Sequence, residues 1–221
     1  MGLWAVVPVK ELGRAKERLA PLLPTGLREA LMLAMLEDVL AALSQTPGLA
    51  GLAVATVDPK GGRLGARYGA RLIEVGARNG HTGAVAAAAR LLTEERCRGM
   101  LTLPGDIPLV TPAEINALVE AHCSAPSFTI APSRDERGSN AVICSPPDAV
   151  PLRFGEDSFF PHLQAAETRR IRPTVLRLPG VALDVDTPED LAAFAALPSP
   201  TRARAVLAEN DMLNASASVR P

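Results

Sequence analysis

The sequence predicts an α/β protein whose mostly parallel sheet carries helices on both faces. Short apolar runs alternate along the chain with longer segments of helical spacing. The first run, residues 3–9, is apolar throughout, as is typical of a strand buried on both faces. The chain has 221 residues, 48% of them hydrophobic and 21% charged, which suits one α/β domain, since such domains reach about 200–250 residues.

Strands are expected where apolar runs end at Pro, Gly or Asp. They are predicted at residues 3–9, 51–57, 71–75, 100–103, 128–131, 141–144, 175–178 and 181–185. Asp58-Pro59 and Gly61-Gly62 are expected to end the second strand. A polar loop, residues 133–139, is expected to join the fifth and sixth strands.

Helices are expected where apolar residues recur at helical spacing. They are predicted at residues 27–43, 82–95, 111–123, 159–167 and 188–197. Thr82 is the expected N-cap of the second helix, and Pro112 the first residue of the third. The domain is therefore expected to cover residues 1–197. Residues 198–221, rich in small, polar and Arg residues, are expected to form a loose tail.

Composition excludes several classes of protein. A net charge of −1 and an aromatic content of 3% offer neither an electrostatic footprint nor stacking platforms for nucleic acid. Cys97, Cys123 and Cys144 form no CxxC pair or metal spacing, so we expect reduced thiols. No signal peptide or apolar span of about 18 residues is visible, so we expect a cytoplasmic chain without membrane partners.

A basic segment follows the first strand and includes Lys10, Arg14, Lys16 and Arg18. Ligands of open α/β sheets bind outside the carboxyl ends of the strands. Four cations against two carboxylates at such an end favour a bound anion, with phosphate the first candidate. The alternative is an ordinary solvated start of a helix.

Two acidic segments also follow strands. Asp106 lies in a turn held by Pro104, Gly105 and Pro108, where a carboxylate could bind Mg²⁺ or serve only the turn. Asp184 and Asp186 share one face of a later strand end. We expect Thr187 to cap the following helix, with Glu189 and Asp190 in its first turn, so those two carboxylates have a structural explanation. Asp184 and Asp186 have none, which favours a metal site with Asp106.

A third group combines small and polar residues. Gly155 permits close approach of a ligand, and Ser139, Asn140 and Ser158 supply neutral hydrogen-bond donors. Ser158 is also expected to cap the next helix. The alternative is two ordinary turns. Residues 78–83 are also expected to contact a ligand, through Asn79, His81 or backbone amides. The other two histidines, His122 and His162, are expected to be surface or packing residues.

Together these segments resemble the guanylyltransferases of coenzyme F420 biosynthesis. The motifs that carry the resemblance are VPVK (7–10), AKERL (15–19), LPGDIP (103–108), GSNA (138–141), RFGEDSF (153–159) and LDVDTP (183–188). They span most of the chain, in order. That family transfers a guanylyl group to 2-phospholactate, phosphoenolpyruvate or 3-phosphoglycerate.

The resemblance implies a single-domain, Rossmann-like nucleotidyltransferase that uses GTP and Mg²⁺. Lys16 and Asp106 would be catalytic. The remaining roles it implies are GTP phosphate binding by Lys10, Lys16 and Arg18, acid binding by Ser139, Asn140, Gly155 and Ser158, and metal binding by Asp106, Asp184 and Asp186. The chain departs from the pattern in two places. Residues 8–13 replace a Gly-rich phosphate loop, and residues 80–84 differ from the segment associated with base recognition.

The implied reaction needs no general base, because a phosphate monoester is mostly dianionic at pH 7. Three neutral donors in the acid site lean toward 3-phosphoglycerate, which carries a hydroxyl. Two other functions stay open: a glycosyltransferase of the same fold, and a non-catalytic nucleotide-binding module. A homodimer is compatible with the sequence.

Overall fold

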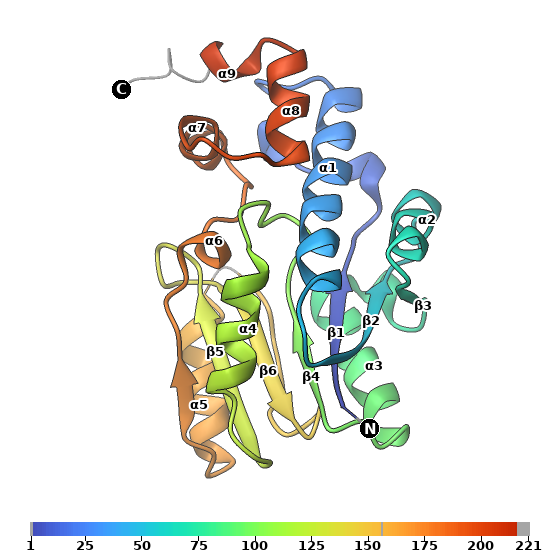
Figure 1. Ribbon diagram of the computed structural model, residues 1–221, viewed down its shortest axis with the longest axis vertical. Coiled ribbons are helices and arrows are strands. Elements are labelled where there is room, and N and C mark those ends of the chain that lie inside the picture. The colour runs from blue at the N-terminus through green and yellow to red at the C-terminus, as the bar shows by residue number, and fades with distance from the viewer. Residues whose placement is uncertain (1, 156, 216–221) are drawn as a thin grey trace.

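A computed structural model describes residues 2–155 and 157–215 of the chain. Its strands form one sheet in the order β3-β2-β1-β4-β6-β5-β7 (Figure 1). Each pair of neighbours is parallel except those of β6, which runs antiparallel to β4 and β5. The strands are β1 (Leu3–Pro8), β2 (Leu49–Ala55), β3 (Arg71–Ile73), β4 (Gly99–Thr102), β5 (Ser127–Pro132), β6 (Ser139–Ser145) and β7 (Pro173–Val175).

The reversal of β6 determines which residues meet at the functional edge of the sheet. Because β6 is antiparallel, its first residues, Ser139 and Asn140, lie at the same edge as the last residues of β1 and β4. Segments that leave β1 and β4 therefore face the start of β6, although they are far apart in the sequence.

Helices cover both faces of the sheet, because neighbouring strand residues point to opposite sides. Val7 belongs to the core formed with α1 (Thr25–Ser44), α2 (Pro59–Arg67) and α4 (Pro112–Ala121). Val6 belongs to the core under α3 (Gly80–Glu94), and α5 (Phe159–Thr168) packs beside a third cluster on that face. The predicted fold class is confirmed. Among the described residues, no helix combines the length and the apolar character needed to span a bilayer.

Short elements complete the chain. Three 3-10 turns occupy Leu12–Arg14, Glu17–Leu19 and Ala77–Asn79. The last helices are α6 (Pro179–Ala182), α7 (Pro188–Ala196), α8 (Arg202–Glu209) and α9 (Met212–Ala215). Thr187 and Asp190 form a reciprocal capping box at the start of α7, which confirms the predicted N-terminus of that helix.

The structure differs from the sequence prediction at α2. The strand does end before Asp58, as expected, but no helix was predicted after it. Instead, the Asp58 carboxylate accepts hydrogen bonds from the backbone N–H groups of Lys60 and Gly61 and caps a helix that begins at Pro59. Pro at the first helical position is favourable, because its missing N–H would be unpaired there in any case.

The two strands expected at 175–178 and 181–185 are also wrong in part. β7 covers only Pro173–Val175, and Pro179–Ala182 forms a single helical turn. Apolar β-branched residues favour strands, but Pro179 cannot donate to a sheet ladder and suits the first turn of a helix. The turn lets the chain change direction before it reaches Asp184.

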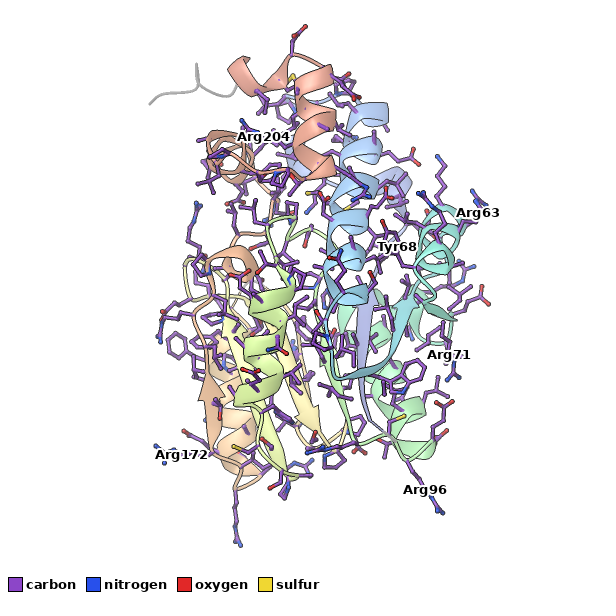
Figure 2. The ribbon with its side chains drawn as sticks, viewed as in Figure 1. Arg63, Tyr68, Arg71, Arg96, Arg172 and Arg204 are labelled. Carbon is purple, nitrogen blue, oxygen red and sulfur yellow. The ribbon has the colours of Figure 1, made fainter. Side chains whose placement is uncertain are left out.

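The segment after Pro198, expected as a loose tail, contains α8, which packs on α1 through Ala203 and Leu207. The Arg204 guanidinium donates hydrogen bonds to the carbonyls of Ala195 and Leu197 and so joins α8 to the end of α7 (Figure 2). Residues 216–221 lie outside the described residues.

Asp38, on α1, supplies the amino end of α8 with a cap from another helix. Its two carboxylate oxygens accept hydrogen bonds from the backbone N–H groups of Arg202 and Ala203, at 2.9 and 3.0 Å. Burial raises the pKa of Asp38, and the two hydrogen bonds only partly offset this effect. The carboxylate therefore links the C-terminal segment to the core.

We expect Asp38→Ala to lower the free energy of unfolding by about 1–2 kcal/mol, the usual effect of losing an N-cap acceptor. Limited proteolysis should then cut within α8 at concentrations of protease that leave the parent intact. Asp38→Asn keeps one carbonyl oxygen and should lose less. Equal protection of α8 in the alanine variant and the parent would show that Asp38 does not hold it.

Candidate active site

Two adjoining cavities open at the functional edge of the sheet. The first has a volume of about 720 Å³ and is lined by the segment after β1, including Lys10, Lys16 and Arg18. The second, of about 780 Å³, is lined by Ser139, Asn140, Gly155, Ser158 and Asp184, among others. Either is large enough for a small-molecule ligand. The two cavities share part of their lining and therefore meet there; the shared residues include Lys10, Arg18, His81, Asp106 and Asp186.

Asp106 is carried to this boundary by the loop that leaves β4. Leu103 and Ile107 are buried in the core on either side of it, which holds the loop against the sheet. The backbone N–H of Val185 donates to the carbonyl oxygen of Asp106 at 3.0 Å. This bond places the segment with Asp184 and Asp186 beside the loop, as their positions after strand-like runs predicted.

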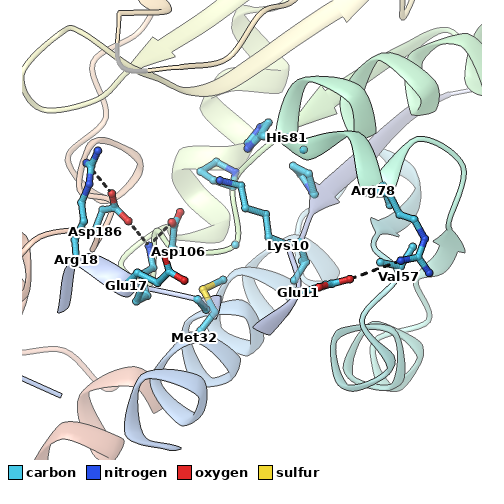
Figure 3. A pocket seen from close by; sticks show the side chains of 18 residues that line it. Lys10, Glu11, Glu17, Arg18, Met32, Val57, Arg78, His81, Asp106 and Asp186 are labelled. Carbon is cyan, nitrogen blue, oxygen red and sulfur yellow. Dashed lines mark hydrogen bonds and ion pairs between the residues drawn. The ribbon is translucent and has the colours of Figure 1, made fainter. Parts of the chain in front are cut away.

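Lys16 lies between two of the carboxylates. Its ammonium group is 2.5 Å from Asp106 Oδ2 and 3.3 Å from Asp186 Oδ1, and its side chain is only 4% exposed. Arg18 donates to the other oxygen of Asp186 at 3.1 Å (Figure 3). Lys16 has a φ of 56°, in the left-handed region that non-glycine residues seldom occupy. Such strain persists where the surrounding structure compensates for it, often at functional sites.

Opposite charges decide the ionisation of this cluster. Burial alone would lower the pKa of Lys16, but Asp106 and Asp186 outweigh it and raise that pKa. Burial would likewise raise the pKa of Asp106, but the neighbouring Lys16 lowers it. Lys16 is therefore an ammonium and Asp106 a carboxylate at neutral pH.

The loop that carries Lys10 and Lys16 is held by an anchor that the sequence did not reveal. Asp58 Oδ2 accepts a hydrogen bond from the backbone N–H of Leu12 at 2.9 Å, and the Leu12 side chain is buried. The Asp58 carboxylate thus joins the start of α2 to the loop after β1, the segment that replaces a Gly-rich phosphate loop. The side chain of Arg14 lies outside the described part of the structure.

Asp184 has a different environment from Asp186. Its Oδ1 accepts a hydrogen bond from Asn140 Nδ2 at 3.0 Å, and the same amide group donates to the carbonyls of Val181 and Ala182. Burial, aided by the nearby charge of Asp106, raises the pKa of Asp184 despite that hydrogen bond. The Asn140 amide is thus occupied by groups of the chain itself.

One carboxylate of this cluster has an oxygen free for a magnesium ion. Among the described residues, no group of three or more His, Cys, Asp or Glu side chains is arranged to hold a metal ion. Asp106 Oδ1, however, is a buried carboxylate oxygen without a hydrogen-bond partner. Mg²⁺ is often held by one or two carboxylates together with substrate phosphates and water. A site based on Asp106 with one further carboxylate fits these residues.

Ser139 and Ser158 meet in the wall of the second cavity. Ser158 is the N-cap residue of α5, as expected, but its hydroxyl makes no capping hydrogen bond and donates to Ser139 Oγ at 3.3 Å. His162, which is 1% exposed, lies behind them with Nδ1 2.9 Å from Ser139 Oγ. A Cβ added at Gly155 would meet no atom within 4 Å, and the backbone there is not left-handed. Packing does not require this glycine, whereas a closely bound ligand would.

A row of three rings runs from the cavities into the protein. His81, which lines both cavities, packs at a tilt against Phe154 with ring centroids 4.3 Å apart, and Phe154 meets the buried His162 edge-on at 5.1 Å. Thr82 was expected to be the N-cap of α3, but the helix begins at Gly80. The Thr82 hydroxyl instead accepts a hydrogen bond from the backbone N–H of Phe154 at 3.0 Å. Thr82 therefore attaches the 153–158 loop to α3.

His162 and His122 were expected to be surface or packing residues, but the ring nitrogens of both have polar partners. For His122 these are Thr129 on β5 and Ser145, the last residue of β6, at the opposite end of that strand from Ser139. The signal that was missed for His162 is its place shortly after the RFGEDSF motif, within ten residues of Gly155 and Ser158. Helical spacing alone could not distinguish its inward direction.

The buried histidines predict acid destabilisation. Burial lowers the pKa of His162 and of His122 to about 4, whereas an unfolded imidazole titrates near 6.5. Between these values the unfolded chain binds more protons, so the free energy of unfolding should fall as the pH drops from about 6.5 to 4. For His162 alone the loss should reach about 3 kcal/mol, at 1.36 kcal/mol per pKa unit. Urea titrations at several pH values would measure it, and a stability that stays constant over this range would contradict the assignment.

Comparisons with known proteins agree with the motifs. A family model described as "Guanylyl transferase CofC like" matches residues 3–211. A phosphoenolpyruvate guanylyltransferase of Rubrobacter xylanophilus is 40% identical over 199 residues, covering 89% of this chain and 95% of that protein. A 3-phospho-D-glycerate guanylyltransferase of Colwellia psychrerythraea is 33% identical, covering 88% of this chain and 92% of that protein.

A solved structure supports the fold. A putative nucleotide-diphospho-sugar transferase from Desulfovibrio desulfuricans G20 superposes with a TM-score of 0.75 and 18% sequence identity, covering 96% of this chain and 97% of that one. At that identity the likeness concerns the fold alone.

Proposed function

Because the chain belongs to the CofC-like guanylyl transferase family, we propose that it transfers the guanylyl group of GTP to a small phosphorylated carboxylic acid, with release of pyrophosphate, in coenzyme F420 biosynthesis. The observation that carries the proposal is the pair of cavities that meet at Asp106 and Asp186. Lys10 and Arg18 line both cavities, as suits two anionic ligands that meet there; the first adds Lys16, and the second adds the hydroxyl groups of Ser139 and Ser158 and the backbone at Gly155.

GTP binds in the first cavity. Lys10, Lys16 and Arg18 line it and neutralise the triphosphate. Lys16 is already held between two carboxylates, so little reorganisation is needed when the phosphates arrive. Bound Mg²⁺ would add a charge that neutralises the α-phosphate and the leaving pyrophosphate.

Asp106 and Asp184 are the carboxylates that we propose for the metal. Asp106 Oδ1 has no hydrogen-bond partner among the described residues, and Asp184 is oriented by Asn140. Asp186 is occupied on both oxygens by Lys16 and Arg18, so its role in this proposal is to hold those cations toward the triphosphate.

The acid binds in the second cavity, beside Ser139, Gly155 and Ser158. A phosphate oxygen of the acid attacks the α-phosphorus of GTP, a new P–O–P bond forms, and the bond to the bridging oxygen of pyrophosphate breaks. The attacking group is already an anion at pH 7, so the site must align two anions rather than remove a proton. In this proposal Lys16 and Asp106 are the catalytic residues, and no general base is required.

Phosphoenolpyruvate is the acid that we propose. The expected preference for 3-phosphoglycerate relied on three spare donors, but the Asn140 amide is occupied and the Ser158 hydroxyl donates to Ser139. A site with few spare donors does not depend on a substrate hydroxyl. The relative with 40% identity is named for the same acid.

The experiment is a competition assay with GTP, Mg²⁺ and equal concentrations of the three acids, with the products identified by mass. We expect guanylylated phosphoenolpyruvate to accumulate together with an equal amount of pyrophosphate. Dominant use of another acid would change the acceptor but leave guanylyl transfer intact. Absence of any guanylylated acid would refute the proposed function, and parallel reactions with ATP and CTP test the choice of nucleotide.

A further inference from the structure

His162 lies behind the wall of the second cavity without being part of it. Its side chain is 1% exposed, and among the described residues it is not one of those that line either cavity. Its ring touches both sides of the acid site: Ser139 at the start of β6, and the backbone of Arg153 in the loop that carries Gly155. A buried polar side chain between two walls of a site can control the geometry of both.

The hydrogen-bond network identifies which ring nitrogen carries the proton. The backbone N–H of Arg153 can only donate, and it donates to His162 Nε2 at 2.9 Å. Nε2 is therefore unprotonated, and in the neutral ring the proton is assigned to Nδ1. Nδ1–H then donates to Ser139 Oγ at 2.9 Å.

This tautomer determines what Ser139 can do. A hydroxyl oxygen has two lone pairs, and those of Ser139 accept from His162 Nδ1 and from the Ser158 hydroxyl. Only the Ser139 O–H is left, and within the described ranges no protein acceptor receives it. Because Ser139 lines the second cavity, that O–H is available to an anionic ligand. Two donors on the oxygen also strengthen the hydrogen bond that its own proton makes.

The same ring holds the opposite wall. His162 accepts a hydrogen bond from Arg153, which comes directly before Phe154 and Gly155 in the chain. The Phe154 ring also meets the His162 ring edge-on at a centroid distance of 5.1 Å. Thr82 attaches the next backbone N–H of this loop to α3. Loss of the His162 contacts would free the Gly155 side of the cavity while the Thr82 contact remained.

We propose that His162 is a positioning residue of the acid site: as the neutral Nδ1–H tautomer, it makes Ser139 an obligatory donor to the acid's anionic group and fixes the Gly155 loop opposite. This inference rests on the proposed function. In that function, His162 determines the affinity for the acid without touching the acid.

Two substitutions separate the two contacts. His162→Asn keeps an amide N–H near the position of Nδ1 and so preserves the donor to Ser139. His162→Gln places its amide nearer the position of Nε2, where its oxygen accepts from Arg153 but Ser139 loses its donor. We expect His162→Gln to raise the KM for phosphoenolpyruvate about tenfold or more, since hydrogen bonds to charged groups have that order of effect. His162→Asn should raise it clearly less, and the KM for GTP should stay within about twofold in both variants.

His122 offers a matched control. It too is a histidine with both ring nitrogens bonded, to Thr129 and Ser145, but it lies at the other end of β6. His122→Asn and His122→Gln should lower the melting temperature without changing the KM for the acid. An acid KM that rises equally in the His122 and His162 variants would overturn the proposal, as would a parallel rise in the KM for GTP.

A binding measurement distinguishes failure of the inference from failure of the function. Phosphoenolpyruvate is titrated calorimetrically into the parent and variants, each saturated with a non-reactive GTP analogue and Mg²⁺. If the parent forms no guanylylated acid, the proposed function is refuted, but the affinities still test His162. Weaker binding to His162→Gln than to His162→Asn supports the inference. Equal binding to all variants, or no binding to the parent, overturns it.

Discussion

Asp106→Asn is expected to lower kcat at least ~100-fold, since removing one preorganised group that stabilises transition-state charge costs about that much or more. The substitution preserves the size of the side chain but removes the negative charge that Lys16 contacts at 2.5 Å. It also converts the unpartnered Oδ1 into part of a neutral amide, which is a weaker metal ligand. Initial rates at rising Mg²⁺ would measure both effects.

The controls for this variant are other carboxylates. Asp148→Asn, at an exposed residue close to the opposite end of β6, should leave kcat unchanged. Asp184→Asn should resemble Asp106→Asn, whereas Asp186→Asn should mainly raise the KM for GTP through Lys16 and Arg18. A near-normal rate for Asp106→Asn at saturating Mg²⁺ would rule out the metal role. A greater loss in Asp186→Asn than in Asp184→Asn would identify Asp186 as the second ligand.

Lys16→Ala is expected to lower kcat/KM for GTP by about 100-fold or more while leaving the KM for the acid within about twofold. The substitution removes the ammonium from between Asp106 and Asp186 and leaves two carboxylates facing the triphosphate. Their side chains are 24% and 41% exposed, so water can solvate them and the fold should persist. Steady-state kinetics with each substrate varied in turn would measure the effect.

Two further substitutions at Lys16 test whether the loss of activity comes from the missing charge of the ammonium group. Lys16→Met keeps most of the volume without the charge and should resemble Lys16→Ala. Lys16→Arg keeps the charge but needs room for a planar group where the buried ammonium fits, so it should not restore activity. If Lys16→Ala raised the KM for the acid alone, the two cavities would have the opposite substrates.

The sequence predicted those features that depend on patterns along the chain. Apolar runs and helical spacing located most strands and helices, and the end of β4 placed Asp106 at the functional edge. Asp184 was also expected there and does lie near Asp106, although a helical turn replaces the strand predicted before it. Thr187 was found as a cap because its partner Asp190 is three residues away. These signals are local, or follow from the rule that parallel strands end at one edge of the sheet.

The features that were missed depend on contacts between distant segments. In the sequence Asp58 marks only the end of a strand, but its second oxygen accepts a hydrogen bond from the backbone N–H of Leu12, 46 residues away. Thr82 binds Phe154, 72 residues away, instead of capping its own helix. Asn140 was counted as a donor for a ligand, but the helical turn at Pro179–Ala182 brings carbonyls that occupy its amide. The order of residue types along the chain does not show which distant groups will occupy a side chain's hydrogen bonds.

The cluster around Lys16 also bears on how the protein folds. Its two carboxylate partners lie 90 and 170 residues further along the chain. Contacts of such long range form only after much chain entropy has been lost, and they slow folding. The cluster should therefore be among the last features to form, so that recovery of catalytic activity during refolding reports the completed native state. Since a ligand seated on these residues binds the native chain alone, its presence should raise the melting temperature by mass action.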